Sequence, residues 1–387
     1  MSLCTRVGIT FAVLILFVSQ ISFATISATK TSEPTVSIPT TQQNKLQQAL
    51  NQWREENKLP GVSATIIIPD LEKPLNLVSG TIKLDGKKRV SPKTLFQLCS
   101  VTKVYTAALI LKLESENKLS ISQTVGSWLP QYPKWGDITI KQLLNMTSGI
   151  PNYTNDEKFT EIWKKNPTKN WTPAEVLSFV ENKSLLYSPG EGWNYDNTNY
   201  VLLGMIIEKA TGKTYDHVLH EKILHPLNLS HTYYAPYEYT PSMLNQMATG
   251  YSESNQDVMN VNMSQAGSAG AIIATTQDAA MFFHYLFAGK ILPKAQMIEM
   301  QTTYSIKTGK QTVIHGEEIV VGFGMSRCLT PEGYMWYKPG GFVGFLSTVS
   351  ILDKNKVVIA ITTNKDPQSV AMQKDIVPKL YHILGQS

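Results

Sequence analysis

The chain has 387 residues, of which 42% are hydrophobic and 17% are charged, a balance typical of a globular protein with a sizeable core. Its 35 Lys and Arg residues against 30 Asp and Glu give a formal net charge of +5. Because this excess is small and the basic residues are scattered, composition argues against a nucleic-acid partner.

The first 24 residues have the layout of a secretory signal peptide. Arg6 precedes an apolar run at 7–18, and small residues at 22–24 place a cleavage site after Ala24. The apolar run is shorter than the roughly 20 residues that a membrane-spanning helix needs, so an uncleaved anchor is the weaker alternative. We therefore expect a periplasmic or secreted protein with no stable membrane span after cleavage.

The segment after the signal peptide is expected to be a solvated linker, over residues 25–44. "TISATKTSEPTVSIPT" is rich in Ser, Thr and Pro and lacks apolar periodicity. The spacing of apolar residues in "LQQALNQW" then predicts one face of a helix. β-rich segments at 62–68 and 75–84 predict two strands.

The rest of the chain is helical first and β-rich later. Helical patterns separated by Pro and Gly loops dominate residues 100–264. β-rich segments then return, at 334–338, 345–352 and 357–363. A last helix is expected from about Val370, with a kink or interruption at Pro378.

Because strands open and close the chain, the expected fold class is α+β. We predict one antiparallel sheet completed by both ends of the chain, flanked by helices and carrying an inserted all-α subdomain. A single catalytic domain would span 45–387, with an α/β part at 45–99 and 265–387 and the helical part at 100–264.

The pattern Ser-x-x-Lys occurs three times, and one occurrence stands out. Ser27 lies in the expected linker and Ser115 lies in a polar helix end, whereas Ser100 directly precedes a long apolar helical run. Unpaired N–H groups and the positive end of the helix dipole would favour a developing oxyanion there. Lys103 lies one turn further on, within reach of the Ser100 hydroxyl. The alternative is that Ser100 only caps the helix, and this motif alone leaves both interpretations open.

Other candidate sites have weaker patterns. Cys99 adjoins Ser100 and is a second candidate nucleophile, although it could also pair with Cys328 in an oxidising compartment. Ser268 in "AGSAG" resembles a nucleophile elbow, but a Gly-rich loop near the site is the preferred interpretation. The histidines of "HEKILH" are five residues apart, about 140° around an α-helix, which argues against a zinc helix. We expect no metal and no cofactor.

Two further motifs follow in order. Tyr195-Asp196-Asn197 lies directly before a helical segment, and Lys338-Pro339-Gly340-Gly341 ends a β-rich segment. With Ser-x-x-Lys, these motifs resemble those of the serine β-lactamase and penicillin-binding protein superfamily, in particular its branch of class C β-lactamases, D-alanyl-D-alanine carboxypeptidases and related esterases. The resemblance runs from about Leu59 to the C-terminus and includes "TLFQLCSVTK", "LLNMTSGIPNY" and "GSAGAIIATTQDAAMF". It implies a β-lactamase/transpeptidase-like fold.

The resemblance also implies catalytic roles. Ser100 would attack an acyl carbon and form an acyl-enzyme. Lys103 and Tyr195 would share the proton transfer, with Tyr195 as the general base toward Ser100 and later toward water. The ammonium groups of Lys103 and Lys338 would favour its phenolate form.

The substrate-binding residues implied by the resemblance are Asn197, Lys338, Gly340 and Gly341. Asn197 would orient Lys103 and meet the substrate amide. The backbone N–H groups of Ser100 and Gly341 would form the oxyanion hole, each worth roughly 3 kcal/mol of barrier.

Two residues depart from the usual pattern. Pro339 stands where many members that bind a substrate carboxylate have Thr or Ser, and it lacks both a hydroxyl and an N–H. This favours an esterase or another amide hydrolase over an efficient β-lactamase or carboxypeptidase. Asp196 stands where small residues are common, and the sequence leaves open whether it tempers the lysine field or faces solvent.

We therefore expect an exported serine hydrolase that acts through a Ser100 acyl-enzyme on β-lactams, D-alanyl peptides or small esters. Its partner would be a small molecule or a peptidoglycan peptide, and its oligomeric state is left open. The alternatives are a penicillin-binding module with little turnover and a carboxylesterase without β-lactam activity. Residues 148–153 and 267–270 are expected to form pocket walls.

Overall fold

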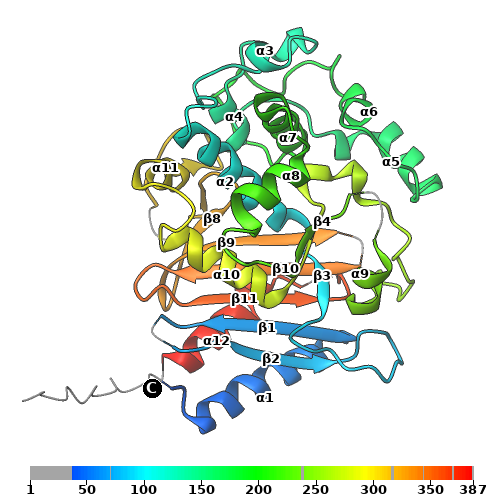
Figure 1. Ribbon diagram of the computed structural model, residues 1–387, viewed down its shortest axis with the longest axis vertical. Helices are drawn as coiled ribbons and strands as arrows, with labels where there is room; N and C mark the ends of the chain where they lie inside the picture. Colours follow the sequence, from blue (N-terminus) through cyan, green and yellow to red (C-terminus); the bar gives the residue numbers. More distant parts are fainter. Residues whose placement is uncertain are drawn as a thin grey trace, which may run out of the picture. The chain divides into compact units, whose positions relative to one another are not determined.

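A large antiparallel sheet and a layer of helices above it make up the fold (Figure 1). The computed structural model describes residues 37–69, 71–236, 239–314, 318–342, 344–367 and 370–385. The signal peptide expected at 1–24 and the linker up to residue 36 lie outside these residues. The remainder of the expected linker is shorter than predicted, because helix α1 (Thr40–Glu56) already begins at Thr40.

The large sheet has the strand order β2-β1-β11-β10-β9-β8-β7-β6. Its strands are β1 Gly61–Ile67, β2 Leu75–Gly80, β6 Tyr304–Ser305, β7 Val320–Val321, β8 Ser326–Thr330, β9 Gly333–Phe342, β10 Phe345–Leu352 and β11 Val358–Thr363. β1 pairs with β11 in antiparallel register, from Val62 opposite Thr363 to Ile67 opposite Val358. The prediction of an antiparallel sheet completed by both ends of the chain is therefore confirmed.

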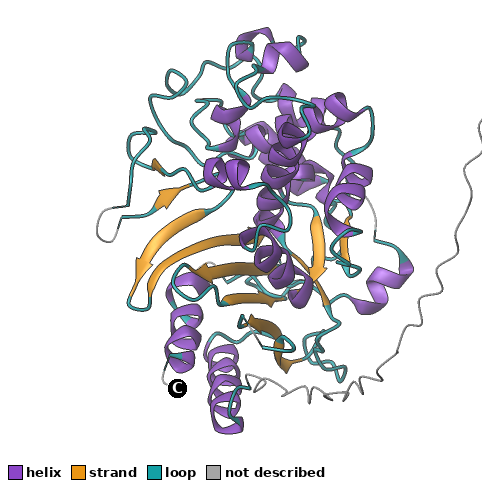
Figure 2. Cartoon of the chain, turned by 60° about the vertical axis from the view of Figure 1, so that its left-hand side comes forward, coloured by secondary structure: helices purple, strands orange, loops and turns teal. Residues whose placement is uncertain are grey.

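Helices cover both faces of this sheet (Figures 1 and 2). α1 and the last helix, α12 (Ile376–Leu384), pack on one face, while α10 (Thr276–Phe287) packs on the other. Successive strand residues point to opposite faces, so Ile359 and Ile361 of β11 join the core beneath α1 and α12, whereas Val358 and Ala360 join the core beneath α10.

The helical part lies above α10, at the top of Figure 1. Its helices are α2 Thr102–Ser115, α3 Val125–Trp128, α4 Ile140–Leu144, α5 Glu157–Lys165, α6 Pro173–Ser178, α7 Thr198–Thr211, α8 Tyr215–Leu219 and α11 Lys294–Met300. Helix α9 (Pro241–Gln246) lies lower, at the level of the sheet in Figure 1. A small second sheet, β3 (Leu95–Gln97), β5 (Ile272–Thr275) and β4 (Thr232–Tyr234), joins this part to the rest. The segment 100–264 is therefore not all-α as predicted, since β4 pairs with β5.

Two predicted boundaries at strand and helix ends are wrong. The strand expected at 75–84 ends at Gly80, whose φ of +77° is a left-handed conformation that turns the chain out of the sheet. The last helix begins at Ile376 rather than near Val370, after a 3₁₀ turn. Pro378 is therefore in its first turn, where a missing N–H costs no helical hydrogen bond, and the expected kink has no cause.

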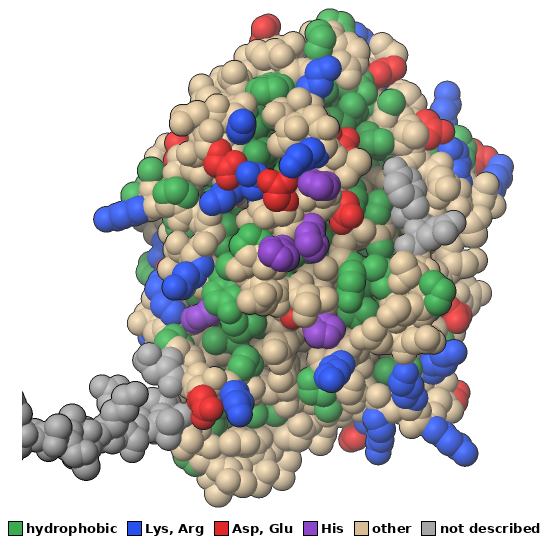
Figure 3. Space-filling view, viewed as in Figure 1, with side chains coloured by type: hydrophobic (Ala, Val, Ile, Leu, Met, Phe, Trp, Pro, Cys, Tyr) green, Lys and Arg blue, Asp and Glu red, His purple; other side chains and the backbone are tan. Residues whose placement is uncertain are grey.

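The surface has no single-sign character on the face seen in Figure 3, where acidic and basic side chains are interspersed. Helices of the described part of the chain are all too short or too polar to cross a membrane. His220 and His225 are closer than an α-helix would place them, with ring centroids 5.8 Å apart, because residues His220–Leu224 form a π-helical turn. No cluster of three metal-ligating side chains occurs in the described residues.

Candidate active site

Ser100 lies in a tight turn that places it at the start of α2. Cys99–Val101 form a 3₁₀ turn, and Cys99 has a φ of +50°, a left-handed conformation that costs a non-glycine residue about 1–2 kcal/mol. The turn is held by the Leu98 N–H, which donates to the Ile272 carbonyl at 2.8 Å, and by the Ser347 hydroxyl, which donates to the Leu98 carbonyl at 2.6 Å. Strained backbone of this kind persists where the surrounding structure over-determines it.

The Ser100 hydroxyl is contacted by the two residues predicted to handle its proton. The Tyr195 hydroxyl donates to Ser100 Oγ at 2.7 Å, and Lys103 Nζ donates to the same atom at 3.3 Å. Lys103 Nζ also donates to Asn197 Oδ1 at 2.7 Å and to the Ala269 carbonyl at 2.9 Å. Residues from three separate segments of the chain therefore meet around the Ser100 hydroxyl and the Lys103 amine.

The competing assignments made from sequence do not fit this geometry. Ser100 is not a cap, since no side-chain capping bond is made at the start of α2. Cys99 is buried and burial raises the pKa of its thiol, so it is a poor nucleophile; it and Cys328 are both free. Ser268 is buried too, and its hydroxyl donates to the Tyr200 carbonyl at 2.8 Å.

Strand β9 brings the third motif to the site. Lys338 is buried, and its Nζ lies 4.8 Å from the centre of the Tyr195 ring, while Lys103 Nζ lies 5.0 Å from it. Gly340 packs directly on the nucleophile turn: a Cβ there would lie 3.0 Å from Ser100 N and 2.3 Å from the Leu98 carbonyl oxygen. Gly341 is exposed at the rim. β8 pairs with β9 only as far as Tyr337, so the end of β9 extends beyond β8 beside the site.

A cavity of about 140 Å³ opens next to Ser100. It is lined by Cys99, Ser100, Tyr153, Thr154, Asn197, Met263, Gln265, Ala266, Ala269, Gly270, Gly341 and Phe342. The two wall segments predicted from sequence, 148–153 and 267–270, both contribute to it. Sequence analysis missed Thr154, Met263, Gln265 and Phe342, although each lies within a few residues of a segment that it did single out.

Burial controls the electrostatics of the site. It lowers the pKa of Lys103 to about 7, with the nearby Asp196 carboxylate opposing the shift, and it also lowers the pKa of Lys338. Asp196 is itself buried, which raises the pKa of its carboxyl to about 7. Of the two possibilities for Asp196, exposure to solvent is therefore excluded.

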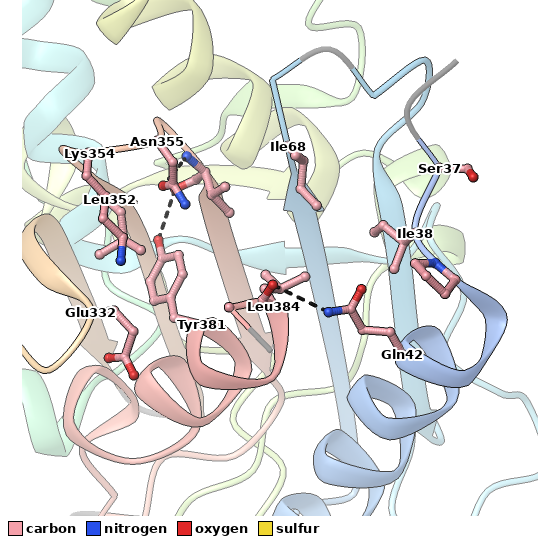
Figure 4. Close-up of a pocket in the computed structure, with 13 residues that line it drawn as sticks. Ser37, Ile38, Gln42, Ile68, Glu332, Leu352, Lys354, Asn355, Tyr381 and Leu384 are labelled. Carbon is pink, nitrogen blue, oxygen red and sulfur yellow. Dashed lines mark hydrogen bonds between the residues drawn. The ribbon is translucent and has the colours of Figure 1, made fainter. Parts of the chain in front are cut away.

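A larger cavity of about 240 Å³ lies elsewhere, between α1, α12 and the β10–β11 hairpin (Figure 4). The Tyr381 hydroxyl donates to the Val357 carbonyl on one side of it, and Gln42 Nε2 donates to the Leu384 carbonyl on the other. None of the candidate catalytic residues lines this cavity.

The fold and the motif order define a serine hydrolase of the β-lactamase/transpeptidase-like class. The family model described as Beta-lactamase matches residues 46–379, and the chain belongs to that family. The resemblance identified from the three motifs is thereby confirmed.

Two curated relatives share part of the sequence. "Penicillin-binding protein 4*" of Bacillus subtilis (strain 168) is 29% identical over 322 residues, which are 79% of this chain and 68% of that protein. "Protein flp" of Staphylococcus aureus (strain NCTC 8325 / PS 47) is 33% identical over 183 residues, which are 46% of this chain and 35% of that protein. The chain thus spans about a third of the length of the second relative.

Solved structures with the same fold include two amide hydrolases. A D-stereospecific amidohydrolase from Streptomyces sp. has a TM-score of 0.75 and 26% identity, covering 88% of this chain and 98% of its own. The D-amino acid amidase from Ochrobactrum anthropi SV3, in complex with L-phenylalanine, has a TM-score of 0.78 and 23% identity, covering 90% and 99%. At 23% identity, the similarity to the D-amino acid amidase shows a shared fold and nothing further.

Proposed function

We propose that this protein is an exported hydrolase that cleaves amides or esters through an acyl-enzyme on Ser100. The observation that carries the proposal is the pair of contacts on Ser100 Oγ, from Tyr195 at 2.7 Å and from Lys103 at 3.3 Å. A serine hydroxyl is a weak nucleophile unless a neighbouring group accepts its proton. Tyr195 and Lys103 are both within reach of that proton, and the amine of Lys103 can be neutral near pH 7.

The reaction has two steps, acylation of Ser100 and hydrolysis of the resulting ester. Ser100 Oγ bonds to the substrate's acyl carbon, its proton passes to the Tyr195–Lys103 pair, and the pair returns a proton to the departing amine or alcohol. Water then attacks the ester and regenerates Ser100. We assign the backbone N–H groups of Ser100 and Gly341 to the developing oxyanion, with Asn197 and Lys338 beside the substrate.

The cavity favours a small apolar side chain on the acyl group of the substrate. Its lining contains no Asp, Glu, Lys or Arg among the described residues, and Tyr153, Met263 and Phe342 give it an apolar character. Pro339 offers no donor to a substrate carboxylate. These features, with the 26% identity to a D-stereospecific amidohydrolase, support an amide or ester of a small D-amino acid ahead of a β-lactam or a D-alanyl peptide.

The test is intact-mass spectrometry of the protein after incubation with a penicillin, with D-phenylalanine amide or with a p-nitrophenyl ester. Wild type is compared with Ser100→Ala and with Ser268→Ala, a matched control at a serine outside the proposed chemistry. We expect an acyl adduct or turnover in the wild type and the control only. An adduct that persists on Ser100→Ala would refute the assignment of the nucleophile.

The lifetime of the adduct separates the alternatives. Rapid release with every acylating substrate identifies a hydrolase. A stable penicillin adduct without turnover would instead support a penicillin-binding module, and turnover of the ester alone would support a carboxylesterase.

A further inference from the structure

The cavity beside Ser100 contains a buried side-chain amide that is hydrogen-bonded at its oxygen end only. This amide belongs to Gln265, which lines the cavity and is 2% exposed. The Tyr153 hydroxyl donates to the main-chain carbonyl of Gln265 at 2.5 Å and, at 3.4 Å, to its Oε1. Gln265 Nε2 is buried without a hydrogen-bond partner among the described residues. A buried donor without a partner is costly, because it has given up its hydrogen bonds to water.

The other side-chain amide of the cavity wall is used at both ends. Asn197 Oδ1 accepts a hydrogen bond from Lys103 Nζ, and Asn197 Nδ2 donates to Thr154 Oγ1 at 3.3 Å. Asn199 also has an amide nitrogen without a partner, but it does not line the cavity. Within the described lining, Gln265 Nε2 is therefore the buried polar side-chain atom that a ligand in the cavity would complete.

The cavity is small enough for a group on its wall to act close to the reacting carbon. Its volume of about 140 Å³ is similar to that of cavities which hold one benzene ring. An acyl group on Ser100 therefore meets Gln265 within a few bonds of the acyl carbon. Because the described lining contains no Asp, Glu, Lys or Arg, a neutral acceptor suits this cavity better than a charged one.

We propose that Gln265 is a specificity-determining residue: its side-chain NH₂ group donates a hydrogen bond to a neutral oxygen acceptor on the acyl group of the substrate. The inference rests on the proposed function, since it names the acyl groups that Ser100 accepts. Gln265 selects acyl groups with a second carbonyl a few bonds from the scissile one, such as the acylamino carbonyl of an N-acylated amino acid. An acyl group without that carbonyl leaves the buried donor unpaired and reacts more slowly for that reason.

The test compares two p-nitrophenyl esters that differ in one carbonyl group. The α-methyllevulinate ester carries a ketone in its acyl chain, whereas the α-methylvalerate ester has a methylene group there, with the same chain length and branching. Gln265→Leu removes the donor at a similar side-chain size. Met263→Leu is the matched control, because Met263 lines the same cavity and is equally buried but has no side-chain donor.

The kinetic readout is the ratio of kcat/KM for the ketone ester to kcat/KM for the methylene ester, after subtraction of the rate with Ser100→Ala. Both esters meet the same protein sample, so a loss of folded protein cancels in this ratio. We expect the ratio to fall about 10-fold in Gln265→Leu and to stay unchanged in Met263→Leu. An unchanged ratio in Gln265→Leu, or an equal fall in the control, would overturn the proposal.

The p-nitrophenyl ester of D-alanine tests whether the amide acts in the opposite sense. Its ammonium group is a hydrogen-bond donor, which the Gln265 oxygen and not the Gln265 NH₂ group would recognise. We expect Gln265→Leu to leave the rate with this ester unchanged relative to the methylene ester. If Gln265→Leu slows the D-alanine ester and does not change the ketone ratio, Gln265 acts as an acceptor and the proposal is wrong.

A binding measurement separates this inference from the proposed function. The primary amides of the two acids are titrated into Ser100→Ala, and NMR follows the Gln265 side-chain NH₂ resonance, assigned with Gln265→Leu. We expect the ketone amide to bind about 10-fold more tightly and to shift this resonance. That result, without acylation of Ser100 by either ester, would refute the proposed function alone. Equal affinities, or no binding of either amide, would overturn the role of Gln265 even if both esters acylate Ser100.

Discussion

Gly340 offers a sharp test of how β9 and the nucleophile turn are joined. A Cβ at this position would lie 2.3 Å from the Leu98 carbonyl oxygen and 2.5 Å from Ser347 Oγ. Those two atoms are themselves joined by the 2.6 Å hydrogen bond that holds the turn. Gly340→Ala must therefore push the strand away from the turn or break that bond.

The size of the effect follows from these contacts. Overpacking a tight site costs about 1–3 kcal/mol, and a lost buried hydrogen bond adds about 1 kcal/mol. We expect Gly340→Ala to lower Tm by roughly 5 °C in a protein of this size. The alanine Cβ would also lie 3.0 Å from Ser100 N, so the nucleophile shifts with the turn. A displacement of about 1 Å at a reacting group can cost on the order of 100-fold in rate.

Gly341→Ala is the matched control, because its Cβ would meet only Leu346 Cδ2, at 3.1 Å, and that methyl group can move. The assay is thermal unfolding of both variants, together with the rate of acylation by the substrate that modifies the wild type. The reasoning is refuted if Gly340→Ala unfolds at the same Tm as Gly341→Ala and acylates at the rate of the wild type.

Three further predictions concern other parts of the molecule. Trp53→Phe removes the 2.6 Å hydrogen bond from Trp53 Nε1 to Asp375 Oδ2, which connects α1 to the start of α12. The free energy of unfolding, measured in urea, should fall by about 1–2 kcal/mol. An unchanged urea midpoint would contradict this prediction. The Cys99 thiol should resist iodoacetamide in the folded protein and react in urea, since burial raises its pKa; prompt native labelling, located by peptide mass, would be the opposite result. Burial raises the pKa of Asp196 from its ordinary value of 3.8 to about 7, so the stability that its protonated form contributes is complete below about pH 4 and is lost as pH rises through 7. The stability of Asp196→Asn relative to the wild type should accordingly rise between about pH 5 and about pH 8. If the urea midpoints of the two proteins differ by the same amount at every pH in that range, the prediction is wrong.

The sequence by itself determined the parts of this protein that depend on local pattern and motif order. β-rich segments near both ends and helical patterns between them predicted one antiparallel sheet, because period-2 and period-3.6 patterns depend on neighbours in the chain. The order of Ser100-x-x-Lys103, Tyr195-x-Asn197 and Lys338-x-Gly340 indicated the family and the site. Element ends were less accurate, as at Gly80, because they depend on single backbone conformations.

Only the tertiary structure showed which side chains surround each candidate site residue. It showed that no side chain caps the start of α2, and that the Ser100 hydroxyl is contacted by Tyr195, which is 95 positions away in the chain. It also decided between solvent and burial for Asp196, whose neighbours in space come from α2 and from loops far along the chain. Protonation at this site follows from burial and from charges brought together by folding, and neither quantity is encoded in the spacing of a motif.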